Sequence, residues 1–187
     1  MDLIYKIKID NTYNQYITMS KFYISYNEVH NIMHKLSEKI LKNYKPDIII
    51  SITGGGLVPS RIIRNYLKCD ILCIGVKLYN ADDTRNNEIV KYQWLENNLE
   101  NKKVLIVDEV DDTRTTLEYV IKELKKENPK ELACCVIHNK KKEKTCEIPS
   151  YCSYYVGEET DDVWICYPWE SKNINEHQTY CDNQKIK

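Results

Sequence analysis

The chain has 187 residues, enough for one domain with a substantial core. Its 27 basic and 28 acidic residues leave a net charge of −1, so no global field favours nucleic acid or an anionic membrane as a partner. The eight cysteines form no C-x-x-C pair, residues 1–20 lack an apolar run of signal-peptide length, and no run of about 18 apolar residues occurs. We therefore expect a soluble cytoplasmic protein with reduced thiols and a single domain over residues 1–187.

The N-terminal region predicts an arm followed by a helix. Residues 1–20 contain one alternation of apolar and polar side chains, at 5–9, which is typical of an edge strand or a loosely held arm. Ser25 and Glu28 have the spacing of a capping box, and apolar residues three and four apart follow over 29–40. This second pattern predicts an amphipathic helix.

A buried strand and a glycine-rich turn come next. The apolar run over 47–52 predicts the strand, and Pro59 stands near the start of another helical pattern. Gly54, Gly55 and Gly56 remove every side chain from the turn, so backbone N–H groups there can approach an anion closely. A flexible connector is the alternative. The position after the carboxyl end of a strand, where open α/β sheets bind ligands, favours a pyrophosphate-binding loop.

Residues 71–100 contain a third strand and a long polar segment. The apolar run over 71–76 predicts the strand. Residues 79–91 are rich in charged and amide side chains and show no clear periodicity, which is typical of a mobile loop.

The most informative stretch runs from Val104 to Leu117. The aliphatic run over 104–107 is short and β-branched, which predicts a strand buried on both faces. An acidic cluster and a polar turn follow it: Asp108, Glu109, Asp111 and Asp112, then Thr113, Arg114, Thr115 and Thr116. Because a helical pattern begins at Leu117, the stretch joins a buried strand to the start of a helix.

This stretch fits a phosphorylated ribose. Thr115 and Glu118 have capping-box spacing, so the N–H groups and hydroxyls of residues 113–116 are free to receive a phosphate. The carboxylates before them suit sugar hydroxyls or a hydrated magnesium ion, which takes one or two carboxylates plus substrate oxygens. The alternative is that the acids solvate a loop and cap a helix. Four acids in five positions repel one another unless a cation or hydroxyls lie among them, which favours the functional interpretation.

The last third predicts a strand, a lysine run and an aromatic segment. The apolar run over 132–138 predicts a core strand, and the lysine run at 140–144 has the pattern of a mostly solvated loop. Trp164 offers a large flat face for a purine, with a core position as the alternative. For Trp169 packing is the preferred interpretation. Residues 171–187 are polar and predict a frayed tail.

Four segments together resemble one enzyme family. DEVDDTRTT over 108–116 resembles the phosphoribosyl-pyrophosphate signature of type I phosphoribosyltransferases, and ITGGGLVPSR over 52–61 resembles the pyrophosphate loop of the purine enzymes. QWL at 93–95 and DDVWICYPWE at 161–170 are similar to segments of the fungal-type hypoxanthine-guanine and xanthine phosphoribosyltransferases. The resemblance covers residues 25–175.

The resemblance implies a fold and a reaction. The fold would be the α/β type I phosphoribosyltransferase core, a mostly parallel sheet flanked by helices, with a small C-terminal hood at 145–170 that binds the base. The enzyme would join a 6-oxopurine to phosphoribosyl pyrophosphate with the help of Mg²⁺, giving the nucleoside monophosphate and pyrophosphate. Residues 79–91 would close over the reaction centre and exclude water, with a mere surface insertion as the alternative. The resemblance also implies that this chain forms a homodimer.

Roles for the phosphoribosyl side follow from the matched positions. Asp108 and Glu109 match the acidic pair that binds the ribose hydroxyls, with Glu109 also close to the magnesium ion. Residues 112–116 match the seat of the 5′-phosphate. Asp112 in addition matches the general base that faces the purine N7.

Further roles concern the pyrophosphate and the base. The three glycines match a loop that commonly holds a cis peptide, here expected at Gly54-Gly55; many relatives have a basic residue at the first glycine, which Arg61 or Arg64 would have to replace. Lys140, with Lys141 as second choice, matches the donor to the purine 6-oxygen. Base binding would also involve the two residues Trp164 and Ile165.

Two other classes of function remain as alternatives. A non-catalytic regulator built on the same fold would bind nucleic acid, but the balanced charge offers no basic face for it. The second alternative is a phosphoribosyltransferase for another base, such as orotate. The segment around Trp164 argues against it. The residues do not select among hypoxanthine, guanine and xanthine, because backbone carbonyls recognise the 2-substituent.

Overall fold

The computed structural model of the chain describes residues 20–79, 85–96 and 98–185. The alternation at 5–9 lies outside these residues. The chain divides into two compact units. The larger unit contains residues 26–162, and the smaller one consists of the flanking residues up to 25 and from 163 onward.

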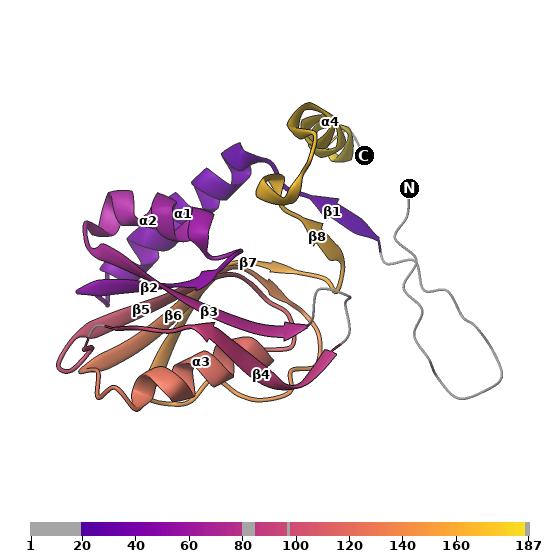
Figure 1. Cartoon of the computed structure of the whole chain (residues 1–187). Coiled ribbons are helices and arrows are strands. Elements are labelled where there is room, and N and C mark those ends of the chain that lie inside the picture. The colour runs from indigo at the N-terminus through magenta and orange to yellow at the C-terminus, as the bar shows by residue number, and fades with distance from the viewer. Residues whose placement is uncertain (1–19, 80–84, 97, 186–187) are drawn as a thin grey trace, which may run out of the picture. The chain divides into compact units, whose positions relative to one another are not determined.

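A six-stranded sheet in the order β4-β3-β2-β5-β6-β7 forms the framework of the larger unit (Figure 1). Its strands are β2 (Ile48–Thr53), β3 (Asp70–Tyr79), β4 (Arg85–Gln93), β5 (Lys103–Asp111), β6 (Glu131–Lys140) and β7 (Cys152–Thr160). Neighbouring strands are parallel except for β3 and β4, which are antiparallel. The predicted mostly parallel α/β sheet is therefore confirmed.

Three helices cover this sheet. Figure 1 shows α1 (Tyr26–Leu41) and α2 (Leu57–Leu67) on one face and α3 (Thr115–Lys125) on the other. Each presents the apolar stripe that its spacing predicted, and the buried positions of α3 are Leu117, Val120, Ile121 and Leu124. These four side chains pack with inward-facing residues of the central strands, such as Ile50 and Ile106.

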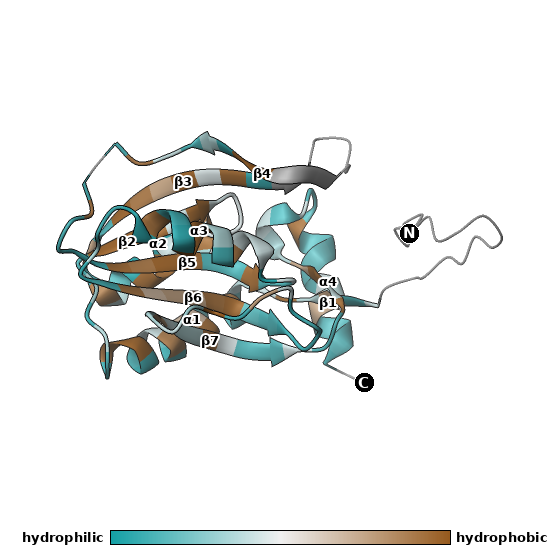
Figure 2. Cartoon of the chain, turned by 90° about the horizontal axis from the view of Figure 1, so that it is seen from below, coloured by the Kyte–Doolittle hydropathy of each residue, from teal (hydrophilic) through white to brown (hydrophobic). Residues whose placement is uncertain are grey.

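The central strands are buried on both faces. Residues Val104, Leu105, Ile106 and Val107 of β5 have no exposed surface. Figure 2 shows β2, β5 and β6 as hydrophobic over most of their length. Burying such runs provides the main driving force for folding, at roughly 25 cal/mol per Å² of apolar surface.

Two segments of the larger unit differ from expectation. Of residues 79–91, expected to form a loop, 80–84 lie outside the described residues, Tyr79 ends β3, and 85–91 belong to β4, which pairs antiparallel with β3. Residues 152–160, which lie in the expected hood, form β7 at the opposite edge of the sheet. Both are edge strands, which carry more polar residues than central ones because one side faces solvent.

The smaller unit joins the two ends of the described chain. Strand β1 (Lys21–Tyr23) pairs in parallel with β8 (Trp164–Cys166), and a 3-10 turn, η1 (Pro168–Glu170), follows. The expectation of a frayed C-terminal tail is wrong, because α4 (Ile174–Gln184) is a helix with Asn173 as its N-cap. Its His177 ring lies 2.8 Å from the carbonyl oxygen of Ile24, which anchors the helix on the chain around β1.

The parallel order brings three connections to one edge of the larger sheet. They are the glycine loop (residues 53–56) after β2, the threonine loop (112–116) after β5 and the lysine segment (140–146) at the end of β6. Because β2, β5 and β6 are neighbours and run in the same direction, their carboxyl ends lie side by side. Within the described residues, no helix has the length and apolarity needed to cross a membrane.

Candidate active site

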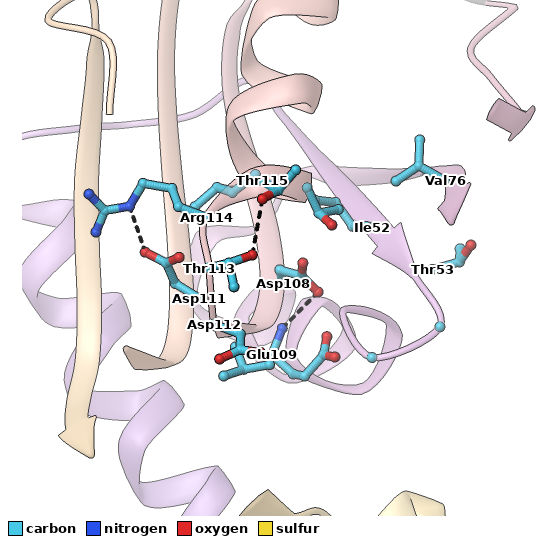
Figure 3. Close-up of a pocket in the computed structure, with 15 residues that line it drawn as sticks. Ile52, Thr53, Val76, Asp108, Glu109, Asp111, Asp112, Thr113, Arg114 and Thr115 are labelled. Atoms are coloured by element: carbon cyan, nitrogen blue, oxygen red, sulfur yellow. Dashed lines mark hydrogen bonds and ion pairs between the residues drawn. The ribbon is translucent and has the colours of Figure 1, made fainter. Parts of the chain in front are cut away.

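A pocket of about 240 Å³ opens where the glycine loop and the threonine loop meet. Its lining comes from β2, β3 and β5 with their following loops: Ile52–Gly55, Val76 and Asp108–Leu117 (Figure 3). The structure therefore brings together all the residues that the sequence assigned to the ribose and the 5′-phosphate. Of the three glycines assigned to pyrophosphate, Gly54 and Gly55 line the pocket, whereas Gly56 is buried and does not line it.

The threonine loop begins later and is built differently from the sequence expectation. Strand β5 continues to Asp111, so the first acids lie on the strand and not in a loop. The capping box of Thr115 is wrong: the N-cap is Arg114, with φ of 71° and no side-chain cap. The Thr115 hydroxyl lies instead 3.0 Å from that of Thr113 and 3.1 Å from that of Thr145. The two loop hydroxyls remain grouped at the pocket, as Figure 3 shows.

The acidic pair is crowded. The N–H of Glu109 donates to the Asp108 carboxylate at 2.9 Å. Burial and the neighbouring Glu109 carboxylate raise the pKa of Asp108 well above its usual range. A bound cation or hydroxyl donors would relieve this repulsion, so the pair fits a magnesium ion that takes its other ligands from substrate and water. Among the described residues, no group of three or more His, Cys, Asp or Glu side chains offers a metal site made by protein alone.

The glycine loop leaves space for its neighbours. A Cβ atom at Gly55 would overlap the Glu109 carboxylate, and one at Gly56 would lie 2.5 Å from the carbonyl oxygens of Ile52 and Val107. The cis peptide is at Thr53-Gly54, one bond earlier than the sequence expectation of Gly54-Gly55. The loop thus presents bare backbone to the pocket.

The two arginines considered as replacements for a basic residue in the glycine loop are engaged elsewhere. Arg61 donates to Asn65 at 2.6 Å, and Arg64 lies 3.4 Å from the Asp70 carboxylate. Neither arginine lines the pocket. The structure therefore does not support the idea that Arg61 or Arg64 replaces the basic residue that the glycine loop lacks.

The lysine segment supplies cations beside the proposed base. Lys140 is the last residue of β6, and its Nζ lies 3.3 Å from the Asp112 carboxylate. Lys142 lies 3.2 Å from the same carboxylate and 3.0 Å from that of Asp162. Lys141, the second choice from sequence, is exposed, so Lys142 and not Lys141 is the second cation here.

These contacts set the charge state of Asp112. Burial would raise the pKa of this carboxyl, but Lys140 and Lys142 outweigh burial and hold the pKa below its usual value. Asp112 is therefore ionised at neutral pH and able to accept a proton. Its basicity would increase if a ligand drew the lysines away.

Several contacts of the site gave no signal in the sequence. Asp111, which the sequence placed in the acidic cluster, is buried and is contacted by the partly buried side chains of Lys144 and Tyr154. Asp162 shares the two lysines with Asp112. The expectation that the later lysines only solvate a loop is wrong for Lys142 and Lys144, whose side chains are 27% and 11% exposed. Only the contacts between distant segments reveal them.

The aromatic segment lies in the smaller unit. Trp164 is 37% exposed, so it is not part of the buried core, and its assignment to the purine stays a prediction. Ile165, the next residue of β8, is buried. Trp169 stacks on Tyr167 with the ring centres 4.6 Å apart, which confirms the packing role expected for it.

Comparison with known proteins identifies the class. The family model described as "Phosphoribosyl transferase domain" matches residues 20–172, and the chain belongs to this family. Xanthine phosphoribosyltransferase 1 of Saccharomyces cerevisiae is 39% identical, over 84% of this chain and 93% of that protein. The hypoxanthine-guanine phosphoribosyltransferase of Schizosaccharomyces pombe is 37% identical, over 86% and 94% respectively.

Solved structures agree with this assignment. A hypothetical protein from Neisseria gonorrhoeae with bound ppGpp has a TM-score of 0.82 and 35% identity, over 89% of this chain and 98% of that one. A purine phosphoribosyltransferase from Pyrococcus horikoshii has a TM-score of 0.69 and 33% identity, over 83% and 97%. The family and fold implied by the sequence motifs are therefore confirmed.

Proposed function

We propose that this chain transfers a phosphoribosyl group from phosphoribosyl pyrophosphate to a 6-oxopurine: hypoxanthine, guanine or xanthine. The observation that carries the proposal is the convergence of the acidic pair, the threonine loop and the Asp112–Lys140 pair at one edge of the sheet. The names of the relatives supply the base, because they act on xanthine, hypoxanthine or guanine. The Neisseria structure with ppGpp, a guanine nucleotide, supports a purine and phosphates as ligands of this fold.

The phosphoribosyl side would be held by backbone and carboxylates. The N–H groups and hydroxyls of the threonine loop (Asp112, Thr113, Arg114, Thr115, Thr116) would bind the 5′-phosphate. Asp108 and Glu109 would accept the ribose hydroxyls, and Glu109 would contact Mg²⁺. When bound, this ion would neutralise charge on the departing pyrophosphate. The bare backbone of Gly54, Gly55 and Gly56 would receive the pyrophosphate itself.

The purine side would use the ion cluster and the aromatic segment. Bond formation joins the purine N9 to the ribose C1′, the bond from C1′ to the pyrophosphate oxygen breaks, and the purine N7 proton passes to Asp112. Lys140 would turn from Asp112 to the 6-oxygen of the base. Trp164 would stack on the purine, and the backbone of Ile165 would bond its edge.

The decisive test is a steady-state assay with phosphoribosyl pyrophosphate, Mg²⁺ and each of five bases. We expect turnover with at least one of hypoxanthine, guanine and xanthine, and none with adenine or orotate. Turnover of orotate alone would show that the substrate is a pyrimidine and contradict the proposed 6-oxopurine. No turnover of any base, together with binding of a nucleic acid, would favour the non-catalytic alternative.

Three further statements belong to the proposal. The matched region spans both units, which supports one phosphoribosyltransferase domain over residues 1–187, with an arm at 1–20, a base-binding hood at 145–170 and a polar C-terminal segment at 171–187. The eight cysteines are all free, which supports a reducing compartment such as the cytoplasm. We also propose a homodimer, which light scattering on the purified chain would test, and neither nucleic acid nor membrane as a partner.

A further inference from the structure

The lysine segment contacts a succession of carbonyl groups in and beside the threonine loop. Lys144 Nζ donates to the carbonyl oxygens of Asp111 at 2.8 Å and Asp112 at 2.7 Å. The N–H and the hydroxyl of Thr145 donate to the carbonyl oxygen of Thr113 at 3.1 Å and 2.9 Å. None of the residues 144–146 lines the pocket. Three consecutive carbonyl oxygens are therefore held by donors that are not part of the pocket wall.

The geometry of the peptide bond turns this contact into an orientation. In a trans peptide the C=O of one residue and the N–H of the next point in opposite directions, because the group is planar. Holding the carbonyls of Asp111, Asp112 and Thr113 toward the lysine segment therefore directs the N–H groups of Asp112, Thr113 and Arg114 the other way. Those N–H groups belong to residues that do line the pocket.

We propose that Lys144 is a positioning residue, which fixes the carbonyl side of the threonine loop so that the N–H side faces the 5′-phosphate of the substrate. The inference rests on the proposed function, since that function supplies a phosphoribosyl ligand. It assigns Lys144 no contact with substrate. An ammonium has three donor hydrogens: two serve the carbonyls, and Nζ also lies 3.6 Å from the Asp111 carboxylate.

The surroundings of Lys144 lock it in place. Its side chain is 11% exposed and that of Asp111 is fully buried. Arg114 Nε lies 2.9 Å from the same carboxylate, and the Tyr154 hydroxyl donates to it at 2.7 Å. Figure 3 shows Asp111 and Arg114 turned toward each other, away from Thr53. A buried carboxylate with these partners gives the ammonium one low-energy position, which is what a positioning role requires.

The backbone of the loop explains why such support is needed. Arg114 has φ of 71°, in the left-handed region that residues other than glycine enter at a cost. The N-terminus of α3 has no side-chain cap that would hold this turn locally. Besides the local bond from Arg114 to Asp111, the turn is held by contacts from elsewhere in the chain, and the lysine segment supplies those at its carbonyl groups.

The experiment measures binding of ribose 5-phosphate and of inorganic pyrophosphate by calorimetry in Lys144→Met. Ribose 5-phosphate reports the threonine loop, whereas pyrophosphate reports the glycine loop and serves as an internal control. We expect the affinity for ribose 5-phosphate to fall about 10- to 100-fold, the range for a lost charged hydrogen bond, and that for pyrophosphate to change less than about twofold. Lys130→Met, which removes an exposed lysine just before β6, should leave both affinities unchanged.

Two further variants keep the proposal testable if Lys144→Met does not fold. Thr145→Val removes the hydroxyl bond to the Thr113 carbonyl and the contact with the Thr115 hydroxyl, and keeps the N–H bond, so it should weaken ribose 5-phosphate binding several-fold. Lys144→Arg keeps the donors and should retain more affinity than Lys144→Met. Equal affinity for ribose 5-phosphate in Thr145→Val, Lys144→Met and the parent chain, with only a lower Tm, would overturn the proposal.

Failure of the proposed function would look different. The calorimetric measurement requires no turnover, so it reports on Lys144 even if the chain transfers no phosphoribosyl group to any purine. If the parent chain binds ribose 5-phosphate but is inactive with all bases, the proposed reaction is wrong. The positioning role is then still tested by the affinity of the variants for ribose 5-phosphate. If the parent chain does not bind ribose 5-phosphate at all, the positioning role is overturned as well.

Discussion

The glycine loop and the threonine loop, the two proposed anion-binding loops, are built in two different ways. The first removes side chains, so that Glu109 and the backbone of Val107 lie where Cβ atoms of Gly55 and Gly56 would be. The second keeps its side chains and has its carbonyls held by Lys144 and Thr145. The comparison teaches that the glycine loop should be sensitive to added atoms and the threonine loop to removed donors.

The largest effect is expected at Asp112, to which the proposed function gives a role in the chemistry in addition to binding. Asp112→Asn preserves shape and removes the proton acceptor, so kcat should fall about 10²- to 10⁴-fold, measured with saturating purine and phosphoribosyl pyrophosphate. The KM for phosphoribosyl pyrophosphate should change little, because the backbone of the loop remains. A loss of kcat below about threefold would restrict Asp112 to a structural role in its loop.

Trp164 provides a reference outside both loops. Trp164→Ala should raise the KM for the purine about 5- to 150-fold, since one stacked ring is lost, and leave the KM for phosphoribosyl pyrophosphate nearly unchanged. Its side chain is 37% exposed, so the variant should fold. Trp164→Phe, which retains a smaller ring, serves as the matched control and should show a smaller rise. Equal rises for both substrates would remove the stacking role.

The glycine loop can be tested by adding one carbon atom. Gly56→Ala places a Cβ 2.5 Å from two backbone carbonyl oxygens, which can only be accommodated by moving β2 or β5. The free energy of unfolding should fall by about 1–3 kcal/mol in urea titration. Gly54→Ala is the matched control, because a Cβ there meets nothing within 4 Å, and its stability should stay within about 0.5 kcal/mol. Similar losses in both variants would contradict the close-approach explanation.

The smallest effect concerns Asp108. Because its folded-state pKa is raised above the unfolded value of about 3.9, folding is disfavoured increasingly as pH rises through the folded pKa. Asp108→Asn should therefore be more stable than the parent at pH 8, by an amount on the order of 1 kcal/mol, with a smaller difference near pH 5. Urea titrations at both pH values check this. Asp70→Asn, at an exposed carboxyl, should show no such gain.

A contrast between central and edge strands explains which parts of the fold could be predicted from the sequence. The central strands were found because continuous apolar runs such as 104–107 have few alternatives. The edge strands β4 and β7 were missed because their sequences, RNNEIVKYQ and CSYYVGEET, are largely polar and hide the alternation. Strands β1 and β8 have three residues each, too few for a periodic signal.

The residues of the site likewise divide into those that the sequence predicts and those that only the structure shows. The acidic pair, the glycines and the threonines were found because each group is contiguous and its chemistry can be read from spacing. Lys144, Tyr154 and Asp162 were missed because their partners lie 20 to 43 residues away in sequence. The location of the cis peptide was wrong by one bond, since adjacent residues of the same turn give no local signal for either position.

The ion cluster of Asp112, Lys140, Lys142 and Asp162 has a consequence for how a neutral base enters the site. Two carboxylates and two ammonium groups sum to zero charge, so a purine that separates them leaves no unbalanced charge behind. If Lys140 exchanges Asp112 for the oxygen of the base, the carboxylate loses a partner that lowers its pKa and becomes a stronger proton acceptor. The Asp112 carboxylate would thereby stay a weak base until the purine, whose proton it accepts, has bound.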